Sequence, residues 1–377
     1  MVKKAKLLIK KACPFFMSLF LFNLFLSPQL IALARFSFDR FLKQSSPAVL
    51  TITDSLKRKV KVPLQVERIL SLQPEISRLI VALGGGDRLV ALDRFIRFED
   101  HLFSLIYPPA KSLPLVAMSD ESINAETVLR FRPDVLFVSP SEPSLAETLS
   151  RKLSIPVIAL ASMGRFDFLL EEMVLVGQLI KKEGRAAELI NYFQEKLELL
   201  AEVLKTVSYR PKPRVYLAFW SSLVMTPVNY DPVKVAGGLN LAEGRWPSYL
   251  GTARTVVSLE QIVHWNPEII LIHGNYPPAE RQVTVEKIIE DERLNSVKAV
   301  REKRIFYTFG FWYWWDPAEA LFECFYLASL FYPEVSSQFN LKALGEEIFA
   351  QFYGKPEAFS QLLSILKIEI PDVALRK

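Results

Sequence analysis

Aromatic side chains stand at several predicted strand ends in the second half of the chain. One strand ends at Phe219 and Trp220, Trp246 follows in a proline-containing loop, and residues 311–315 are five consecutive aromatic residues. Consecutive side chains point in different directions, so neither a strand nor a helix buries all of them. Open α/β sheets bind ligands beyond the carboxyl ends of their strands. We therefore predict that the following side chains contact a ligand: Trp220, Trp246, Trp312, Tyr313 and Trp314. The alternative is a hydrophobic plug beneath the helix that begins near Pro317.

Arg94, Arg97 and Arg245 are candidate partners for anionic groups on such a ligand. A guanidinium group binds a carboxylate through two parallel hydrogen bonds and also stacks on aromatic rings. The alternative for each arginine is a solvated position on the surface. Arg94 and Arg245 are assigned to the ligand site.

The sequence carries no dense catalytic or metal-binding signature. It has no G-x-S-x-G, H-E-x-x-H or C-x-x-C motif, and its three histidines lack metal-ligand spacing. Glycines 84–86 are not followed by Lys-Ser/Thr, so they are predicted to end a helix and not to hold phosphate. We predict no metal site, no cofactor and no enzymatic activity. An enzyme would have to use scattered groups: Asp93, Asp231, His273 and Asp316.

The basic character of the chain comes from its first residues. The 377 residues include 46 Lys+Arg and 41 Asp+Glu, and half of the chain is hydrophobic. Five lysines and no acidic residue lie in residues 1–34, and the remainder holds 41 basic against 41 acidic side chains. A chain of this composition folds around a core and lacks the field that attracts nucleic acid.

Residues 1–34 have the three parts of a secretory signal peptide. A lysine-rich start is followed by an apolar stretch and by Ala32-Leu33-Ala34. We predict cleavage after Ala34, export to the periplasm and a short tether over residues 35–48. The alternative is an uncleaved anchor, although the uninterrupted apolar run is shorter than the roughly 20 residues that a spanning helix needs. Cys13 lies within the signal, so Cys324 is left without a disulfide partner and is predicted to be buried.

Strands and helices alternate through residues 49–183. A hairpin is predicted over residues 49–62, followed by short apolar strands at 69–72, 89–92, 135–138 and 156–160 with helices between them. Residues 166–207 are nearly all helix formers, interrupted at Gly184, and apolar residues recur at helical spacing from 185 to 204. This region predicts a long helix over residues 184–207.

The first pattern returns after the long helix. Residues 259–272 repeat the arrangement of residues 126–138, with an amphipathic turn, Pro and an acidic residue, then a four-residue apolar strand. Two such copies predict two similar lobes. The predicted fold is α/β, with two Rossmann-like lobes that have mostly parallel sheets and are joined by one long α-helix. The N-terminal lobe spans residues 49–183 and the C-terminal lobe spans residues 208–377.

A resemblance to a known family rests on motifs in both lobes. The motifs occupy residues 51–63, 68–74, 82–90, 236–240, 257–261 and 299–306. Their order and spacing over residues 49–355 resemble the periplasmic substrate-binding proteins of ABC importers for metal chelates. This group has a single long interlobe helix and serves ferric siderophores, haem and cobalamin. The chain differs from the usual pattern at Ser77-Arg78, where the family carries Thr-Glu, and at Lys303, where it turns with Asn-Gly.

The resemblance implies capture of a metal chelate in an interlobe cleft and delivery to an ABC permease with its ATPase. It adds Gln73, at the end of the first strand, to the ligand site, and it places permease-docking carboxylates at Glu142 or Glu147 and at Glu280. We expect a monomer that binds a small molecule. The alternatives are a periplasmic enzyme and a ligand-sensing module that use the same cleft.

Overall fold

The fold was analysed in a computed structural model that describes residues 49–63, 65–117, 123–248, 252–309 and 315–371. Residues from Ala48 onward form one compact unit. The predicted signal peptide and tether, residues 1–48, lie outside the described residues. Within the described part of the chain, no helix combines the length and the hydropathy needed to cross a membrane.

The first sheet has four parallel strands in the order β4-β3-β5-β6. Its strands are β3 (Ile69–Ser71), β4 (Leu89–Leu92), β5 (Val135–Val138) and β6 (Val157–Ala159). Every residue of β5 is buried, which explains why this strand is a continuous apolar run instead of an alternating one. The predicted hairpin precedes the sheet as β1 (Val49–Thr53) and β2 (Lys59–Pro63), which pair antiparallel.

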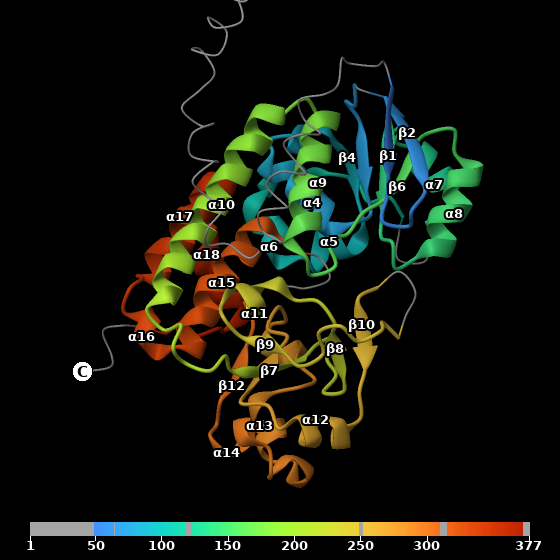
Figure 1. The fold of residues 1–377 in the computed structure, drawn as a ribbon. Coiled ribbons are helices and arrows are strands. Elements are labelled where there is room, and N and C mark those ends of the chain that lie inside the picture. The colour runs from blue at the N-terminus through green and yellow to red at the C-terminus, as the bar shows by residue number, and fades with distance from the viewer. Residues whose placement is uncertain (1–48, 64, 118–122, 249–251, 310–314, 372–377) are drawn as a thin grey trace, which may run out of the picture. The chain divides into compact units, whose positions relative to one another are not determined.

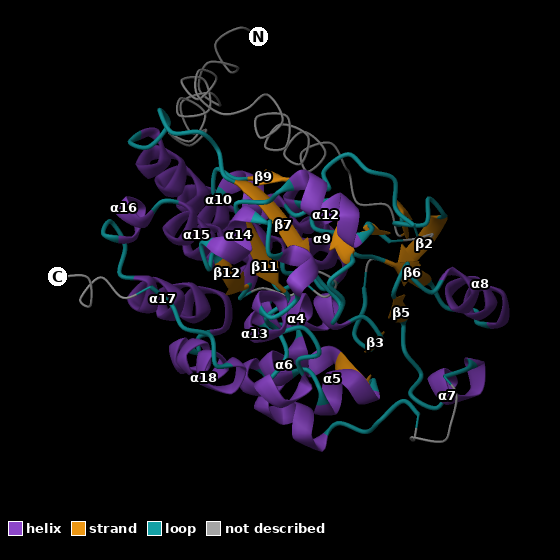
Figure 2. Cartoon of the chain, turned by 90° about the horizontal axis from the view of Figure 1, so that it is seen from below, coloured by secondary structure: helices purple, strands orange, loops and turns teal. Residues whose placement is uncertain are grey.

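Short helices connect the strands of the first sheet and flank it (Figures 1 and 2). They are α4 (Pro74–Ala82), α5 (Arg94–Phe98), α6 (His101–Ile106), α7 (Ala125–Leu129) and α8 (Pro143–Lys152). Asn124 caps α7 with its side chain in a reciprocal capping box with Thr127.

Two helices follow the first sheet, α9 (Phe166–Leu179) and α10 (Glu183–Lys205). The predicted long helix is therefore present, but the predicted break at Gly184 is wrong. The chain breaks just before α10, where Lys181 has a φ of 52°, and Gly184 lies in the first turn of α10. Lysine seldom adopts this left-handed conformation, so the sequence did not indicate that the chain turns at Lys181 after α9. Glycine more often occupies this position after a helix.

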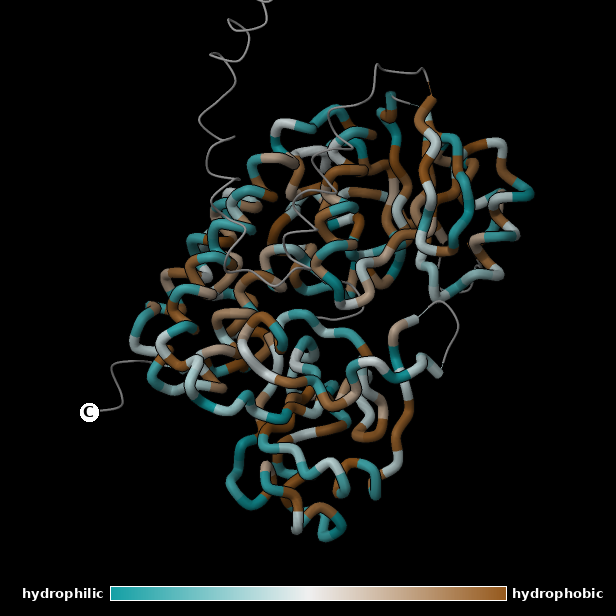
Figure 3. Tube along the Cα trace, viewed as in Figure 1, coloured by the Kyte–Doolittle hydropathy of each residue, from teal (hydrophilic) through white to brown (hydrophobic). Residues whose placement is uncertain are grey.

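The second sheet also has four parallel strands, in the order β12-β11-β7-β9. Its strands are β7 (Arg214–Ala218), β9 (Leu239–Asn240), β11 (Ile269–Ile272) and β12 (Ile305–Tyr307), and a separate antiparallel pair is formed by β8 (Met225–Pro227) and β10 (Arg254–Val256). The helices among these strands are α11 (Asp231–Val235), α12 (Leu259–Trp265), α13 (Val285–Ile289) and α14 (Lys298–Arg301). The predicted α/β fold with two parallel sheets and a long helix between them is confirmed. Hydrophobic residues are concentrated in the strands of both sheets (Figure 3).

The last helices contact elements from both sheets. They are α15 (Pro317–Phe331), α16 (Pro333–Ser336), α17 (Leu341–Tyr353) and α18 (Pro356–Leu366). All but one residue of α15 are buried, so it is a core helix that needs no polar face. α15 packs against α10 and α11, while α17 contacts α4 and α18 contacts α6. The predicted lobe boundaries, with residues 208–377 as one lobe, therefore stay a prediction. We use "first half" for residues 49–205 and "second half" for residues 214–309.

A pair of buried carboxyl groups lies at the start of α4. Glu75 accepts hydrogen bonds from the Ser162 hydroxyl and from the Ser162 backbone N–H, and it shares a hydrogen bond with Glu172 on α9. Burial raises the pKa of Glu75 from 4.5 to about 7, and burial together with Glu75 raises the pKa of Glu172 further. The folded protein therefore holds protons on this pair that the unfolded chain releases.

Stability is expected to fall as the pH rises through the pKa of Glu75. The stability that comes from the proton is complete below the unfolded pKa of 4.5 and is lost as the pH rises to about 7. A shift of this size corresponds to about 3 kcal/mol in the free energy of unfolding. Urea unfolding between pH 4.5 and about 8 measures it. Glu75→Gln, which cannot ionise, should reduce the pH dependence and leave the part that comes from Glu172, and an unchanged slope in this variant would contradict the assignment.

Candidate ligand-binding site

The carboxyl ends of the first sheet are joined by a buried glutamine. Gln73 follows β3, has no exposed surface, and donates from Nε2 to the backbone oxygen of Leu160 beyond β6 at 3.0 Å. The side chain thereby connects two strand ends that are not neighbours in the sheet. Its contacts are those of a positioning residue beneath this edge of the sheet, and its predicted ligand contact stays a prediction.

Helix α5 presents an exposed cation–aromatic cluster beyond the end of β4. Asp93 starts the helix by accepting from the backbone N–H of Phe95 at 2.7 Å. The guanidinium carbons of Arg94 and Arg97 lie 5.2 Å and 5.5 Å from the centre of the Phe98 ring, which is 56% exposed. We call Arg94, Arg97 and Phe98 the α5 cluster. It offers positive charge and an apolar surface at the same place.

Trp220 lies in a strained turn at the end of β7. Trp220 and Ser221 have φ values of 53° and 55°, and the Ser222 N–H donates to the Phe219 oxygen at 3.1 Å. Two consecutive residues with positive φ are typical of a type I′ turn, which usually contains Asn and Gly. A tryptophan in this conformation is rare and is costly unless its surroundings hold it. Such strain is concentrated at functional sites, which favours a role for Trp220.

His273 supports this turn from the end of β11. Its ring stacks on Phe219 at 4.5 Å with an interplanar angle of 13°, and its Nδ1 accepts from the Trp220 backbone N–H at 3.4 Å. Burial lowers the pKa of His273 to about 3, so the imidazole is neutral at physiological pH. His273 therefore positions Trp220 through packing and a hydrogen bond, without carrying charge.

Arg254 is a cation at this edge that the sequence analysis missed. Its guanidinium carbon lies 5.7 Å from the centre of the Trp220 ring, and its side chain is half-buried. Arg254 begins β10, and the antiparallel pairing of β10 with β8 brings it to the strand end. Trp220 and Arg254 form a second cation–aromatic contact, which we call the Trp220–Arg254 pair.

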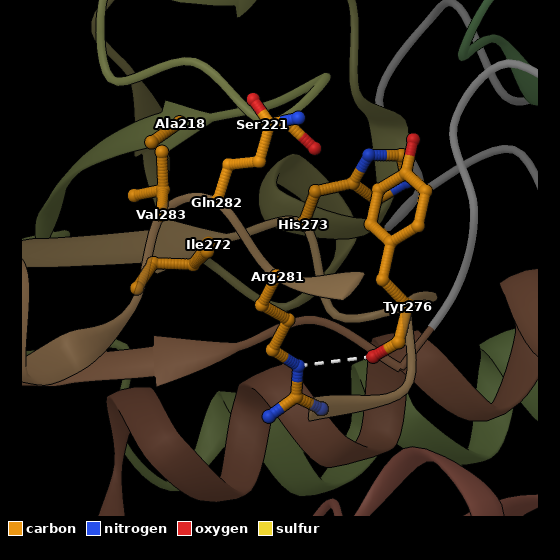
Figure 4. Close-up of a pocket in the computed structure, with 8 residues that line it drawn as sticks. All are labelled: Ala218, Ser221, Ile272, His273, Tyr276, Arg281, Gln282 and Val283. Atoms are coloured by element: carbon orange, nitrogen blue, oxygen red, sulfur yellow. Dashed lines mark hydrogen bonds between the residues drawn. The ribbon is translucent and has the colours of Figure 1, made fainter. Parts of the chain in front are cut away.

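A small hollow with a cavity volume of about 10 Å3 lies beside the Trp220 turn (Figure 4). It lies at the ends of β7 and β11 and is lined by Ala218, Ser221, Ile272, His273, Tyr276, Arg281, Gln282 and Val283. Arg281 closes one side by donating from Nε to the Tyr276 oxygen at 3.0 Å. A cavity needs about 10–15 Å3 to hold one water molecule, and ligand pockets usually enclose about 300–1,000 Å3. This hollow therefore has room for about one water molecule and not for a ligand.

A family model described as periplasmic binding protein matches residues 69–309. The match covers both parallel sheets and the long helix between them. The chain belongs to this family.

Relatives of this periplasmic binding protein are named for different ligands. The molybdate-binding protein MolA of Haemophilus influenzae is 26% identical over 329 residues, which are 80% of this chain and 90% of MolA. The vitamin B12-binding protein of Yersinia pestis is 26% identical over 55% of this chain and 70% of its own.

Solved structures show the same fold. The structure of MolA bound to molybdate superposes with a TM-score of 0.65 at 24% identity, covering 81% of this chain and 98% of MolA. A periplasmic heme-binding protein of Pseudomonas aeruginosa superposes with a TM-score of 0.54 at 20% identity, over 71% of this chain and 93% of its own. At these identities the likeness shows the fold and not the ligand.

Arg245 lies apart from the predicted ligand residue Trp220. The Arg245 guanidinium carbon lies 4.6 Å from the ring centre of Trp265, and the Trp265 oxygen accepts from Arg214, the first residue of β7. Arg245 therefore lies toward the edge where the strands of the second sheet begin, and not at the carboxyl ends that the prediction assumed. The neighbouring Trp246 is 90% exposed. Sequence proximity to a strand did not determine which end of the strand each residue approaches.

Two aromatic residues belong to the core: Phe309, which precedes the run at residues 311–315, and Trp315, the last residue of that run. Phe309 is fully buried against Phe322, and Trp315 is fully buried and stacks on Phe166 at 5.1 Å. At these two positions the hydrophobic-plug alternative is correct. Trp312, Tyr313 and Trp314 lie outside the described residues.

Each carboxylate that an enzyme would need accepts its own structural hydrogen bond from a backbone N–H group. Asp93 caps α5, Asp231 accepts from the Phe166 N–H at 2.7 Å, and Asp316 caps α15. No group of three or more His, Cys, Asp or Glu side chains among the described residues is placed to hold a metal ion. The relatives named above are binding proteins, in agreement with a role in transport.

Proposed function

We propose that this periplasmic binding protein captures an anionic chelate between the carboxyl edges of its two sheets and delivers it to an ABC permease. The observation that carries the proposal is a cation–aromatic contact at each edge: the α5 cluster on the first sheet and the Trp220–Arg254 pair on the second. α5 lies on the side of the first half that faces the second, and the start of β10 lies on the side that faces the first (Figure 1).

These two contacts suit a ligand that has both charge and an extended apolar face. An arginine stacked on an aromatic ring presents a flat surface and still offers N–H groups to an anion. Contact with aromatic rings contributes about 0.5–1.5 kcal/mol per ring beyond the burial of area. Haem, ferric siderophores and corrinoids have such faces. The similarity to a vitamin B12-binding protein supports this class.

A bare oxyanion is the second candidate ligand. It is favoured by the similarity to MolA, a molybdate-binding protein that this chain matches over 90% of its length. An oxyanion would use the arginines and hydroxyl groups but gains little from exposed aromatic rings.

The bound ligand itself decides between these candidates. The protein is purified from its own source, and its visible spectrum, native mass and metal content are measured. A Soret band, a corrinoid spectrum or a catecholate–iron band supports the chelate and names its class. Stoichiometric molybdenum or tungsten without an organic component supports the oxyanion. A bound ligand that carries no anionic group contradicts the proposal.

Docking on the permease is proposed to use Glu142 or Glu147 on the first half and Glu280 on the second. All three side chains are exposed. The variant Glu142→Lys/Glu280→Lys is expected to bind ligand normally but to fail in uptake assays, because charge pairs at a docking surface control orientation and association rate. Glu195→Lys/Glu290→Lys, which changes the same charge at other exposed positions, is the matched control. Normal transport by the docking variant would remove the assignment.

Export is proposed to use residues 1–34 as a cleaved signal. Mass spectrometry of the protein from its source is expected to find Arg35 as the first residue. A chain that keeps residues 1–34 and sediments with membranes would instead show the uncleaved anchor.

A further inference from the structure

A buried arginine stands between the two halves of the protein. Arg78 on α4 is 2% exposed. It donates from Nε and Nη2 to the two carboxylate oxygens of Asp100, also in the first half, at 2.8 Å and 2.7 Å. Its third nitrogen, Nη1, lies 3.5 Å from Oε2 of Glu319 on α15. The Glu319 side chain is fully buried. Arg78 is also a position where the sequence departs from the Thr-Glu of the family it resembles.

Polar residues on the same face of α15 as Glu319 make hydrogen bonds to the second half. Glu323, one turn after Glu319, accepts from the Phe309 N–H at 2.6 Å and from the Tyr230 hydroxyl at 3.3 Å. Tyr326 donates to the Tyr307 oxygen at the end of β12 at 3.0 Å. α15 therefore contacts the second sheet through Glu323 and Tyr326 and the first half through Glu319.

A second joint connects the halves elsewhere. The Asp231 N–H donates to the Gly164 oxygen at 2.9 Å, and Asp231 accepts from the Phe166 N–H at 2.7 Å. The packing of α15 on α10, of α17 on α4 and of α18 on α6 also joins the C-terminal helices to the first half. Within this packing, the Arg78–Glu319 contact is a directional polar link between α4 and α15.

Burial and neighbouring carboxylates favour the neutral form of Glu319. Asp100 already balances the guanidinium in a bidentate pair. Burial, aided by Asp316, Asp100 and Glu323, raises the pKa of Glu319 well above its usual range, although Arg78 opposes this. A glutamine has the same shape as Glu319 and can accept the hydrogen bond from Arg78 in its place.

We propose that Arg78 and Glu319 are positioning residues that fix the angle between the two halves, and therefore the separation of the α5 cluster from the Trp220–Arg254 pair. A methionine at 319 fills the same volume but accepts no hydrogen bond. It leaves the Arg78–Asp100 pair and the packing of α15 on α10 in place, so only the polar link from Arg78 to α15 is removed. The inference concerns the joint and holds for any ligand.

Spin-label distances between the halves test this inference without a ligand. Labels are attached at Ser144→Cys on α8 and Ser296→Cys before α14, both exposed, in a Cys13→Ser background, since Cys324 is buried. Glu319→Met is expected to broaden the distance distribution about twofold, because the halves then sample several angles. Glu319→Gln is expected to keep the narrow distribution of the parent protein.

Glu268→Met is the matched control. Glu268 accepts from Lys298 at 2.7 Å and from the Arg214 N–H at 3.1 Å, both within the second half, so its loss should lower stability and leave the distance unchanged. A folded Glu319→Met protein with the parent distribution overturns the inference. If circular dichroism shows that Glu319→Met does not fold, Arg78→Lys replaces it, since one ammonium group cannot span both carboxyl groups. An unchanged distribution in that variant overturns the inference equally.

Discussion

Alanine at Gly274 is expected to destabilise the protein by at least about 3 kcal/mol, because the strain cannot be relieved by a side chain. A Cβ atom built at this position lies 1.9 Å from the backbone oxygen of Thr308. Gly274 follows His273 directly, and its N–H donates to the Thr308 hydroxyl at 3.1 Å. The close approach holds the chain that leaves β11 against the chain that leaves β12, beneath the edge proposed to bind ligand. Urea unfolding of the purified variant measures the loss.

Gly184 provides the matched control for that substitution. It lies in the first turn of α10, where a Cβ atom would meet nothing within 4 Å. Gly184→Ala should therefore stabilise the protein by about 0.5–1 kcal/mol through helix propensity and lower backbone entropy in the unfolded chain. The two alanine variants thus differ in sign. A Gly274→Ala protein as stable as the parent would show that β11 and β12 do not approach this closely.

The elements with strong local patterns were predictable. Strands β5 and β11 are four-residue apolar runs directly after Pro and an acidic residue, and both are completely buried. Such runs identify central parallel strands because both faces are covered. The repeat of this pattern on each side of α10 was enough to predict two similar sheets. These signals depend on neighbours in sequence and not on tertiary contacts.

The joint between the halves was not predictable from local patterns. The apolar composition of α15 indicates a buried helix, but it does not say that Glu319 meets Arg78, which is 241 positions away in sequence. The left-handed conformation of Lys181 was missed for a different reason, since lysine is not a residue type that favours positive φ. The Arg78–Glu319 contact is long-range, and a single sequence does not display such contacts.

The candidate site was predicted in part. Trp220 lies at a strand end as expected, because the end of an apolar strand is a local signal. That signal does not say which arginine lies beside Trp220. The guanidinium carbons of Arg245 and Arg254 both lie over a tryptophan ring, at 4.6 Å and 5.7 Å. Only Arg254 lies over the ring of Trp220. The pairing of β10 with β8 makes this difference. An alternating Arg-Thr-Val segment at 254–256 was the only sequence signal for that strand.

Loss of the Arg254 guanidinium is expected to weaken ligand binding by about 10- to 100-fold, the loss typical when an arginine that pairs with an anionic group is removed. The probes are haemin, cyanocobalamin and molybdate, titrated by calorimetry and by quenching of tryptophan fluorescence. Whichever probe binds the parent protein should bind Arg254→Met with a larger Kd, and Arg254→Lys should recover part of the loss.

Arg245→Met is the control that makes the Arg254 measurement specific. It removes the same charge from the same kind of arginine–tryptophan contact, but toward the opposite edge of the second sheet. Its affinity for the probe should equal that of the parent protein, because screening in water leaves little Coulomb energy over such a separation. Equal weakening by both substitutions would mean that the ligand senses only the net charge of the second half, and the Trp220–Arg254 pair would then lose its proposed role. Selective weakening by Arg254→Met, together with unchanged unfolding free energy, would place the anionic group of the ligand at the carboxyl ends of β7 and β11, where the strained turn holds Trp220.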